Sequence, residues 1–129
     1  MNNLIDRAFI IHSKTFGETS VIFEFLTEEN GLISAILKGA KRRKDISQLQ
    51  LSKELIINTS RANLPLLLKY ELSKSYVIKR DYLLLVIYFN ELIYRLVPKS
   101  QPQKTLFDFY RNYISYMSTT QDHQDSVII

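Results

Sequence analysis

The chain has 129 residues, of which 46% are hydrophobic and 23% charged, a composition typical of a folded globular protein and unlike that of a disordered one. It contains no cysteine, which excludes disulfides, thiolate zinc sites and cysteine nucleophiles. The formal net charge is +4, but residues 1–80 hold 13 Lys and Arg against 8 Asp and Glu, whereas residues 81–129 hold 4 against 5. The positive excess belongs to the first part of the chain, which favours an anionic partner there.

Up to about residue 78, apolar residues mostly alternate with polar ones and turn residues recur at short intervals, a pattern typical of short antiparallel strands. In one segment Val21, Phe23 and Phe25 share a face while Glu24 interrupts the other. Asn30-Gly31 predicts a tight hairpin, because these residues readily adopt positive φ. We expect five strands, at residues 7–15, 19–26, 32–38, 51–59 and 66–75.

The fifth segment shows the clearest alternation, with Leu66, Leu68, Tyr70 and Leu72 predicted to face a core and the residues between them to face water. Five strands in so short a stretch need closure or cover to hide their edges, and a small barrel does this most economically. Residues 1–79 are therefore predicted to form a five-stranded antiparallel β-barrel of the OB type.

Near residue 80 the pattern changes to helical spacing. Asp81 is a candidate N-cap for a helix over residues 82–97, which Pro98 ends. Its apolar stretch, residues 82–89, is too short to span a bilayer and predicts a buried helix. A second helix from about Pro102 carries Leu106, Phe109, Tyr110, Tyr113 and Met117 at helical spacing. The predicted fold class is α+β, with the barrel followed by a helical hairpin at residues 80–118 and a disordered tail at 119–129.

The most informative stretch holds five positive charges in seven residues, at Lys38, Lys41, Arg42, Arg43 and Lys44. Charges so close repel one another unless an anion joins them, and a phosphate backbone does so with release of counterions. A solvated loop and a membrane-surface patch are the alternatives from charge alone. The position directly after the third strand of an OB barrel favours nucleic acid, because such barrels bind single strands with basic side chains and aromatic rings.

Other residues are candidates for widening such a surface, and each is a weaker candidate than the charge run. Most of the aromatic rings are expected to be core, with one or two free for stacking on bases: Phe16, Phe23, Phe25, Tyr70 and Tyr76. Further candidate DNA contacts, each also explicable as an ordinary exposed charge, are Arg7, Lys14, Lys53, Arg61 and Lys69.

Catalysis finds little support in the sequence. His12 and His123 lie far apart and have no carboxylate partner at a recognisable spacing, and Glu28-Glu29 is better explained by its turn. There is no glycine-rich phosphate loop and no metal-ligand cluster. We therefore expect a protein that is not an enzyme and has no cofactor. The N-terminus lacks the features of an export signal, which predicts a cytoplasmic protein with no membrane partner. Binding to DNA would make it nucleoid-associated.

Several motifs, in this order and spacing, resemble the bacterial RecO recombination-repair proteins. The N-terminal ones are residues 8–13 (AFIIHS), 16–20 (FGETS), 26–31 (LTEENG) and 38–42 (KGAKR), and the helical ones are residues 88–98 (YFNELIYRLVP) and 106–110 (LFDFY). The resemblance spans about residues 5–118. It implies an OB-fold domain packed on a helical domain, in a protein that binds single- and double-stranded DNA and anneals complementary strands.

The resemblance also implies partners. Family members work with RecR and the single-stranded-DNA-binding protein to load the RecA recombinase, and the family's basic DNA-contacting surface corresponds here to Lys38, Lys41, Arg42, Arg43 and Lys44. Relatives run longer, through further helices to which the contact with the single-stranded-DNA-binding protein is largely attributed. We therefore expect a truncated or degenerate copy, whose helical hairpin would expose apolar side chains unless it packs on the barrel, forms a homodimer or meets a partner.

Two hypotheses follow from the sequence. The first is a DNA-binding module of recombinational repair, whose affinity falls with salt and with alanine at residues 41–44. The second is a protein-interaction module whose hairpin docks a partner while the barrel is only scaffold. It predicts that a charged residue at Leu96 or Phe107 abolishes partner capture and leaves DNA affinity intact.

Overall fold

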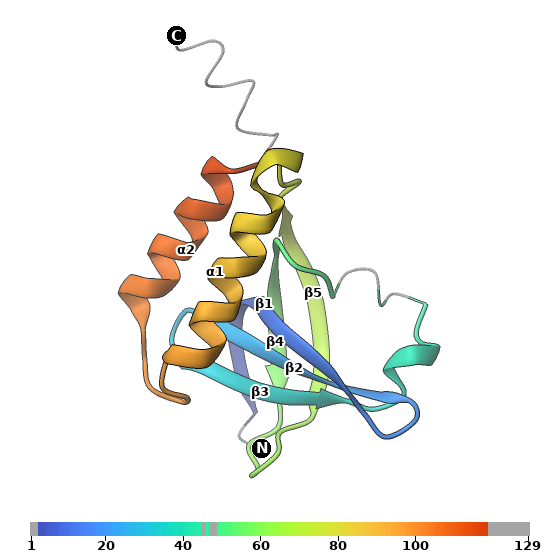
Figure 1. The fold of residues 1–129 in the computed structure, drawn as a ribbon. Coiled ribbons are helices and arrows are strands. Elements are labelled where there is room, and N and C mark those ends of the chain that lie inside the picture. Colours follow the sequence, from blue (N-terminus) through green and yellow to red (C-terminus); the bar gives the residue numbers. More distant parts are fainter. Residues whose placement is uncertain (1–2, 45, 47–48, 119–129) are drawn as a thin grey trace, which may run out of the picture.

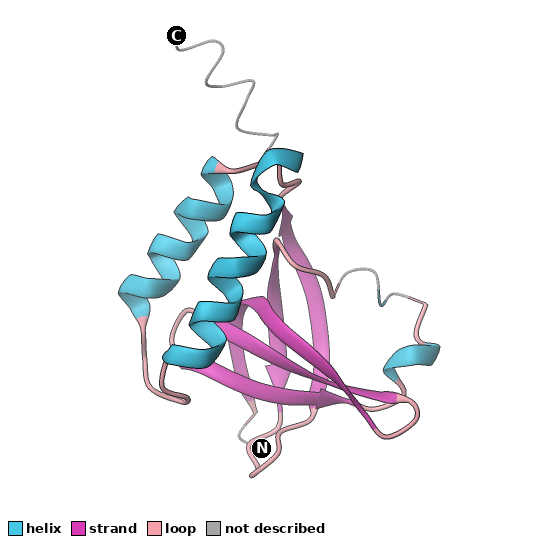
Figure 2. Ribbon diagram, in the orientation of Figure 1, coloured by secondary structure: helices cyan, strands magenta, loops and turns pink. Residues whose placement is uncertain are grey.

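A computed structural model describes residues 3–44, 46 and 49–118. Five strands are followed by two helices, with the helices side by side on one flank of the sheet and the loop that carries η1 projecting from the opposite flank (Figures 1 and 2). The strands are β1 (Leu4–Phe16), β2 (Ser20–Thr27), β3 (Gly31–Leu37), β4 (Lys53–Thr59) and β5 (Leu67–Ser75). The helices are α1 (Leu83–Leu96) and α2 (Lys104–Tyr116), with short 3-10 turns η1 (Ala40–Arg42) and η3 (Arg80–Tyr82).

The sheet has the order β3-β2-β1-β4-β5, and each of these neighbouring pairs is antiparallel. The two outer strands meet in parallel, where the Ile36 N–H donates a hydrogen bond of 2.8 Å to the Pro65 carbonyl. This contact brings the two outer edges of the sheet together at one point and so closes the barrel. The predicted five-stranded OB-type barrel followed by a helical hairpin is confirmed.

The turn between β2 and β3 is the predicted hairpin, with Gly31 at φ 72°. The buried Asp6 carboxylate on β1 organises it by accepting hydrogen bonds from the Glu29 backbone N–H and from Asn30 Nδ2. The Thr27 hydroxyl donates to the Gly31 carbonyl at 2.7 Å and accepts from the Asn30 N–H at 3.0 Å. Side chains thus supply hydrogen-bond partners for polar groups of the turn that have none within the sheet.

Alternation along the strands produces two separate cores. On β1, Ala8 and Ile10 point into the barrel, where they pack with Phe23, Phe25 and other apolar side chains. Their neighbours on the opposite face of the strand, Phe9 and Ile11, pack against the helices in a second core. Its other buried members come from β2, β3, α1, α2 and the residues just after β5 and α2: Leu26, Leu32, Tyr76, Val86, Ile93, Phe107, Tyr110, Ile114 and Met117. The hairpin therefore covers much of its apolar surface by packing on the barrel.

The prediction for β5 was partly wrong. Leu67, and not its neighbour Leu68, is buried in the barrel, and Leu68 and Leu72 are exposed. For Leu68 the pairing shows why, because Leu67 lies opposite Thr59 and Lys69 lies opposite Asn58, which leaves Leu68 as an extra residue. Leu72 lies opposite the buried Leu55, so its exposure does not come from this irregularity. Such a bulge shifts the alternation by one position, and sequence periodicity does not reveal it.

Asp81 is not the N-cap of the first helix. It lies inside η3, and α1 starts at Leu83 after Tyr82, whose side chain makes no capping hydrogen bond. The predicted end of the helix before Pro98 is correct, since Leu96 is its last residue.

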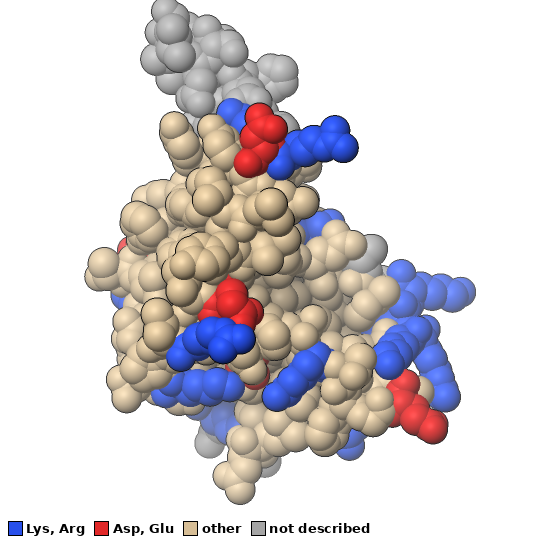
Figure 3. Space-filling model, viewed as in Figure 1, with Lys and Arg blue, Asp and Glu red and all other residues tan. Residues whose placement is uncertain are grey.

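The expectation that residues 82–89 form a buried helix was wrong. Of this stretch only Val86 is fully buried, while α1 turns five large apolar side chains outward: Leu83, Leu84, Leu85, Ile87 and Tyr88. We call these five residues the outer face of α1. The space-filling view shows the helical part of the molecule with few charges and the Lys and Arg side chains gathered mainly around the barrel (Figure 3).

In α2 the predicted apolar positions are mostly correct, with Tyr110 and Met117 buried and Leu106 and Tyr113 packed at the edge of the second core. Phe109 is the exception, because it is exposed and Phe107 occupies the core in its place. The buried Tyr110 hydroxyl donates to Asn90 Oδ1 at 2.6 Å, and burial raises the pKa of this phenol. The predicted disordered tail lies outside the described residues, and the division into units at residue 79 stays a prediction.

Candidate nucleic-acid interface

The basic run forms an exposed loop beyond the end of β3. Gly39 takes a left-handed conformation, with φ 67°, and turns the chain into η1. Ala40 is fully buried in the barrel core, and the Lys41 N–H donates to the Thr19 carbonyl at 3.1 Å, which ties the loop to the β1–β2 turn. We call the five exposed cations of this loop the basic arm: Lys38, Lys41, Arg42, Arg43 and Lys44.

Arg43 of the basic arm contacts the barrel at Tyr70 of β5. The Arg43 Nε donates a hydrogen bond of 2.9 Å to the Tyr70 hydroxyl, and its guanidinium lies 5.3 Å from the centre of the Tyr70 ring. Among the described residues, Lys38, Lys41, Arg42 and Lys44 form no ion pair. These cations therefore repel one another without compensation from a described carboxylate, which favours an added anion.

The aromatic candidates are sorted by burial. Phe23 and Phe25 lie in the barrel core and Tyr76 lies in the second core, so none of the three presents a free ring. Phe16 is 48% exposed at the end of β1, beside the β1–β2 turn to which the basic arm is tied, and Tyr70 is partly exposed on β5. Phe16 is therefore the best-placed ring for stacking on a base.

The five weaker charge candidates do not gather in one place. Lys14 is exposed towards the arm end of β1, and Lys53 is half-exposed at the start of β4. Arg7 on β1 reaches over the neighbouring strands: its side chain pairs with Glu54 on β4 at 3.4 Å and donates to Ser73 Oγ on β5 at 2.9 Å. Lys69 is exposed on β5, and Arg61 lies in the β4–β5 loop at the opposite end of the barrel from the basic arm.

The described residues give no sign of a metal centre, since they contain no group of three or more His, Asp or Glu side chains close enough to hold an ion. His12 stacks on Tyr94 with ring centres 3.9 Å apart, a packing role at the barrel–helix boundary. His123 lies outside the described residues. No helix in the described part of the chain has the length and apolar character needed to cross a bilayer.

Comparison with known proteins identifies the family of the chain. The family model described as "Recombination protein O N terminal" matches residues 1–76, which include the whole barrel. The chain belongs to the RecO family. Residues beyond the matched segment continue into the two helices of the hairpin.

Curated RecO proteins from several bacteria are similar over most of this chain. The DNA repair protein RecO of Hahella chejuensis is 32% identical over 120 residues, which are 91% of this chain and 50% of that protein. The DNA repair protein RecO of Nitrosococcus oceani is 30% identical over 128 residues, 96% of this chain and 52% of that protein. That of Coxiella burnetii is 33% identical over 112 residues, 84% and 48% respectively. The chain spans about half the length of the curated relatives it matches.

The outer face of α1 is the feature that sequence reasoning missed. The apolar stretch was visible, but periodicity does not say how many sides of a helix are covered. A helix that is apolar on nearly all sides needs cover on nearly all sides, and the barrel and α2 cover only part of α1.

Proposed function

We propose that the chain is a DNA-binding protein of recombinational repair that binds single- and double-stranded DNA without sequence preference through the basic arm. The observation that carries the proposal is the exposure of all five arm cations at one end of an OB-type barrel. Support comes from membership of the RecO family, whose curated relatives are named DNA repair proteins.

The physical basis is electrostatic. Each cation that neutralises a phosphate releases a condensed counterion, so binding weakens as salt rises, and contacts to the backbone alone carry no sequence information. OB barrels add stacking of bases on exposed rings, for which Phe16 is available beside the basic arm.

We further propose the finer activities that the family resemblance implies. These are annealing of complementary strands and loading of RecA together with RecR and the single-stranded-DNA-binding protein, in the cytoplasm at the nucleoid. None of them maps onto a particular described residue, so each calls for its own assay in the presence of the named partner.

The central test is a titration of fluorescent single- and double-stranded oligonucleotides at two salt concentrations. Replacing residues 41–44 by alanine should remove most of the affinity and lower the slope of log K against log salt, by up to about 3 for a single strand. A second variant with alanine at Lys41, Arg42 and Lys44 spares the contact between Arg43 and Tyr70. Binding that ignores both salt and these substitutions contradicts the proposal.

The matched control replaces three exposed cations outside the basic arm, Lys74, Arg80 and Arg95, by alanine. It removes the same charge as the triple arm variant. If the proposal holds, the control keeps affinity close to that of the wild type. An equal loss in both variants would mean that net charge, and not the arm, sets the affinity.

A specific observation also favours a second candidate function, an interaction module. The outer face of α1 exposes Leu84 by 78% and Tyr88 by 63%, and contiguous apolar surface of this kind marks contacts with other proteins. The face suits either a second copy of this chain or a partner. Of the two residues suggested from sequence, Leu96 is 73% exposed and suits the test, whereas Phe107 is fully buried, so a charge there would unfold the protein.

The second function is tested with Leu84→Glu and Tyr88→Glu in the whole chain, with sedimentation velocity and the oligonucleotide titration as readouts. If α1 is the docking face, the substitutions disrupt an oligomer or partner complex and leave DNA affinity unchanged. Wild-type protein that is monomeric and captures none of RecR, RecA or the single-stranded-DNA-binding protein contradicts the second function.

A further inference from the structure

A polar pocket opens at the end of the barrel opposite the basic arm. β3 and β5 meet at Ile36, and from there towards Gly31 a cavity of about 410 Å³ lies between β3, the β4–β5 loop and the loop after α1. This volume is within the range of ligand sites, roughly 300–1,000 Å³. Its described lining has no acidic side chain and offers polar groups and cations from three segments: Ser34, Ser60, Arg61, Asn63, Lys99 and Ser100. The Ser34 hydroxyl already donates to the Glu24 carboxylate at 2.6 Å, so this side chain is not a free donor. We call this cavity the polar pocket.

Lys99 is held in place at the pocket by the fold. The loop after α1 runs parallel to β3, where the Ser100 N–H donates to the Leu32 carbonyl at 2.8 Å. The Lys99 ammonium then reaches Glu24 Oε1 at 2.9 Å and Ser34 Oγ at 3.2 Å. The Glu24 carboxylate, whose side chain is only 3% exposed, forms an ion pair with Lys99. This pair fixes the position of the ammonium group but adds no net charge to the pocket.

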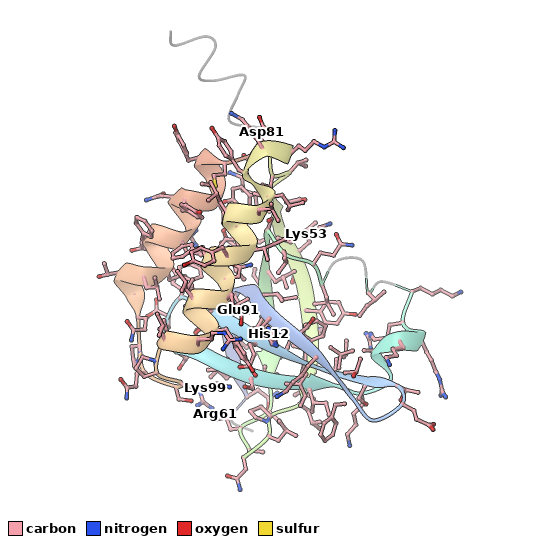
Figure 4. The ribbon with its side chains drawn as sticks, viewed as in Figure 1. His12, Lys53, Arg61, Asp81, Glu91 and Lys99 are labelled. Atoms are coloured by element: carbon pink, nitrogen blue, oxygen red, sulfur yellow. The ribbon has the colours of Figure 1, made fainter. Side chains whose placement is uncertain are left out.

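Arg61 supplies the uncompensated charge of the pocket. Its side chain is exposed in the β4–β5 loop, and within the described part of the chain it has no ion-pair partner. Arg61 and Lys99 come from segments far apart in the sequence, yet they lie close together beneath β3 (Figure 4). A guanidinium with free donors in a cavity without described acids favours an anion, above all a phosphate.

The edge of β3 adds a backbone donor. The Leu32 carbonyl accepts from the loop after α1 and the Ile36 N–H donates to Pro65, so both groups face the edge away from β2. Backbone groups alternate between the two edges of a strand, which directs the Ser34 N–H to that same edge, between these two contacts. Backbone N–H groups of this kind contribute to anion sites.

We propose that the polar pocket binds a phosphate of the same DNA strand that the basic arm contacts, so that the strand runs along β3. The inference rests on the proposed function. Only four positions separate Ser34 at the pocket from Lys38 at the arm, about 13 Å of extended chain. Both ends therefore fit within one OB-fold site, which spans about 4–16 nucleotides. β3 carries no charged residue that would repel the strand, and its residues between the two ends are buried, so the strand makes its contacts at the pocket and at the arm and passes over the surface that covers β3 between them.

The test compares Arg61→Ala with Arg80→Ala, a matched control that removes an exposed arginine outside the pocket. Affinity is measured for a long oligothymidylate and for a thymidine dinucleotide, whose single internucleotide phosphate cannot occupy both ends at once. The proposal predicts that Arg61→Ala weakens the long oligonucleotide roughly three- to tenfold and lowers its salt slope by about 0.7, with the short one and the control unchanged. Arg61→Lys should restore part of the loss.

A second readout follows the backbone amide of Ser34 by NMR during addition of the long oligonucleotide or of inorganic phosphate. The oligonucleotide should shift this amide in the wild type and in the arm variant at higher concentration, but not in Arg61→Ala. If the arm variant loses binding while Arg61→Ala keeps it, this inference falls and the proposed function stands. If neither variant loses binding, the proposed function falls. A pocket that saturates with phosphate alone and ignores the oligonucleotide overturns the inference in favour of a free phosphate ligand.

Discussion

At the arm end of the barrel, five cations follow one another along the chain and project from it, tied down by the buried Ala40, one backbone hydrogen bond and the contact between Arg43 and Tyr70. At the pocket end, the β2–β3 turn, the β4–β5 loop and the loop after α1 meet, and each depends on the others. Charge at the first end is a property of a segment. Charge at the second is a property of the fold.

The difference teaches that the two ends should respond differently to substitution. A change in the basic arm should alter DNA affinity with little effect on stability, because few described contacts depend on the arm. A change at the pocket end should alter stability, and with it the geometry of the pocket. Three pairs of substitutions, one member at each end, sharpen or break this comparison.

The largest effect is expected for the two left-handed glycines. A Cβ on Gly31 would overlap the Gln101 backbone oxygen, whereas one on Gly39 meets nothing within 4 Å. Both replacements by alanine carry the cost of positive φ, about 1–2 kcal/mol. Gly31→Ala should also displace the loop after α1 and lose its backbone hydrogen bond, for a total of about 3 kcal/mol. Thermal unfolding should show a fall in Tm on the order of 10 °C for Gly31→Ala and about half of that for Gly39→Ala. Equal falls would contradict the comparison.

A smaller effect is expected for two threonines. Thr27→Val removes a buried hydroxyl and leaves the Gly31 carbonyl and the Asn30 N–H without their partner, at a cost of about 1–2 kcal/mol. Thr19 holds the basic arm through its backbone carbonyl, which valine keeps. Thr19→Val should therefore change the free energy of unfolding in denaturant by less than about 0.5 kcal/mol. A larger loss for Thr19→Val than for Thr27→Val would reverse the assignment of the two ends.

The smallest effect on the free energy of unfolding is expected for two side-chain contacts, Lys104 with Glu28 at the pocket end and Arg43 with Tyr70 at the arm end. Only the contact at the pocket end is expected to depend on pH. Lys104 donates to Glu28 at 2.6 Å, and this hydrogen bond holds the pKa of the Glu28 carboxyl below its usual value of 4.5. The contact therefore stabilises the folded protein above the usual pKa, and its contribution is lost as the pH falls through the lowered one. Lys104→Met should be slightly less stable than the wild type at neutral pH and equal to it in acid.

The matched control at the arm end is Tyr70→Phe, which removes the hydroxyl that accepts from Arg43 Nε. Neither a phenol nor a guanidinium titrates in acid, so its small difference in unfolding free energy should stay constant over the same pH range. Denaturant titrations of the three proteins at several pH values provide the measurement. A gap for Lys104→Met that persists in acid would show that packing, and not charge, is lost.

The local predictions succeeded where a single segment carries the information. Asn30-Gly31 marks a tight turn wherever it occurs between two strands, and the run after Leu37 is charged in any fold. They failed where a distant partner decides. Leu68 faces outward because β4 and β5 pair with an extra residue, and Asp81 lies in η3 instead of capping α1. Leu84 is exposed because the barrel and α2 cover only one side of its helix.

The sequence by itself determined the strand alternation, the change to helices near residue 80, the membership of the RecO family and the position of the basic arm in the chain. Only the tertiary structure decided that β3 closes on the β4–β5 loop, that Arg61 and Lys99 share a pocket, and that α1 keeps an apolar outer face. The physical reason is how far apart in the sequence the interacting residues lie. Alternation, turns and charge runs follow from neighbouring residues, whereas a pocket between three loops exists only after contacts distant in sequence have formed.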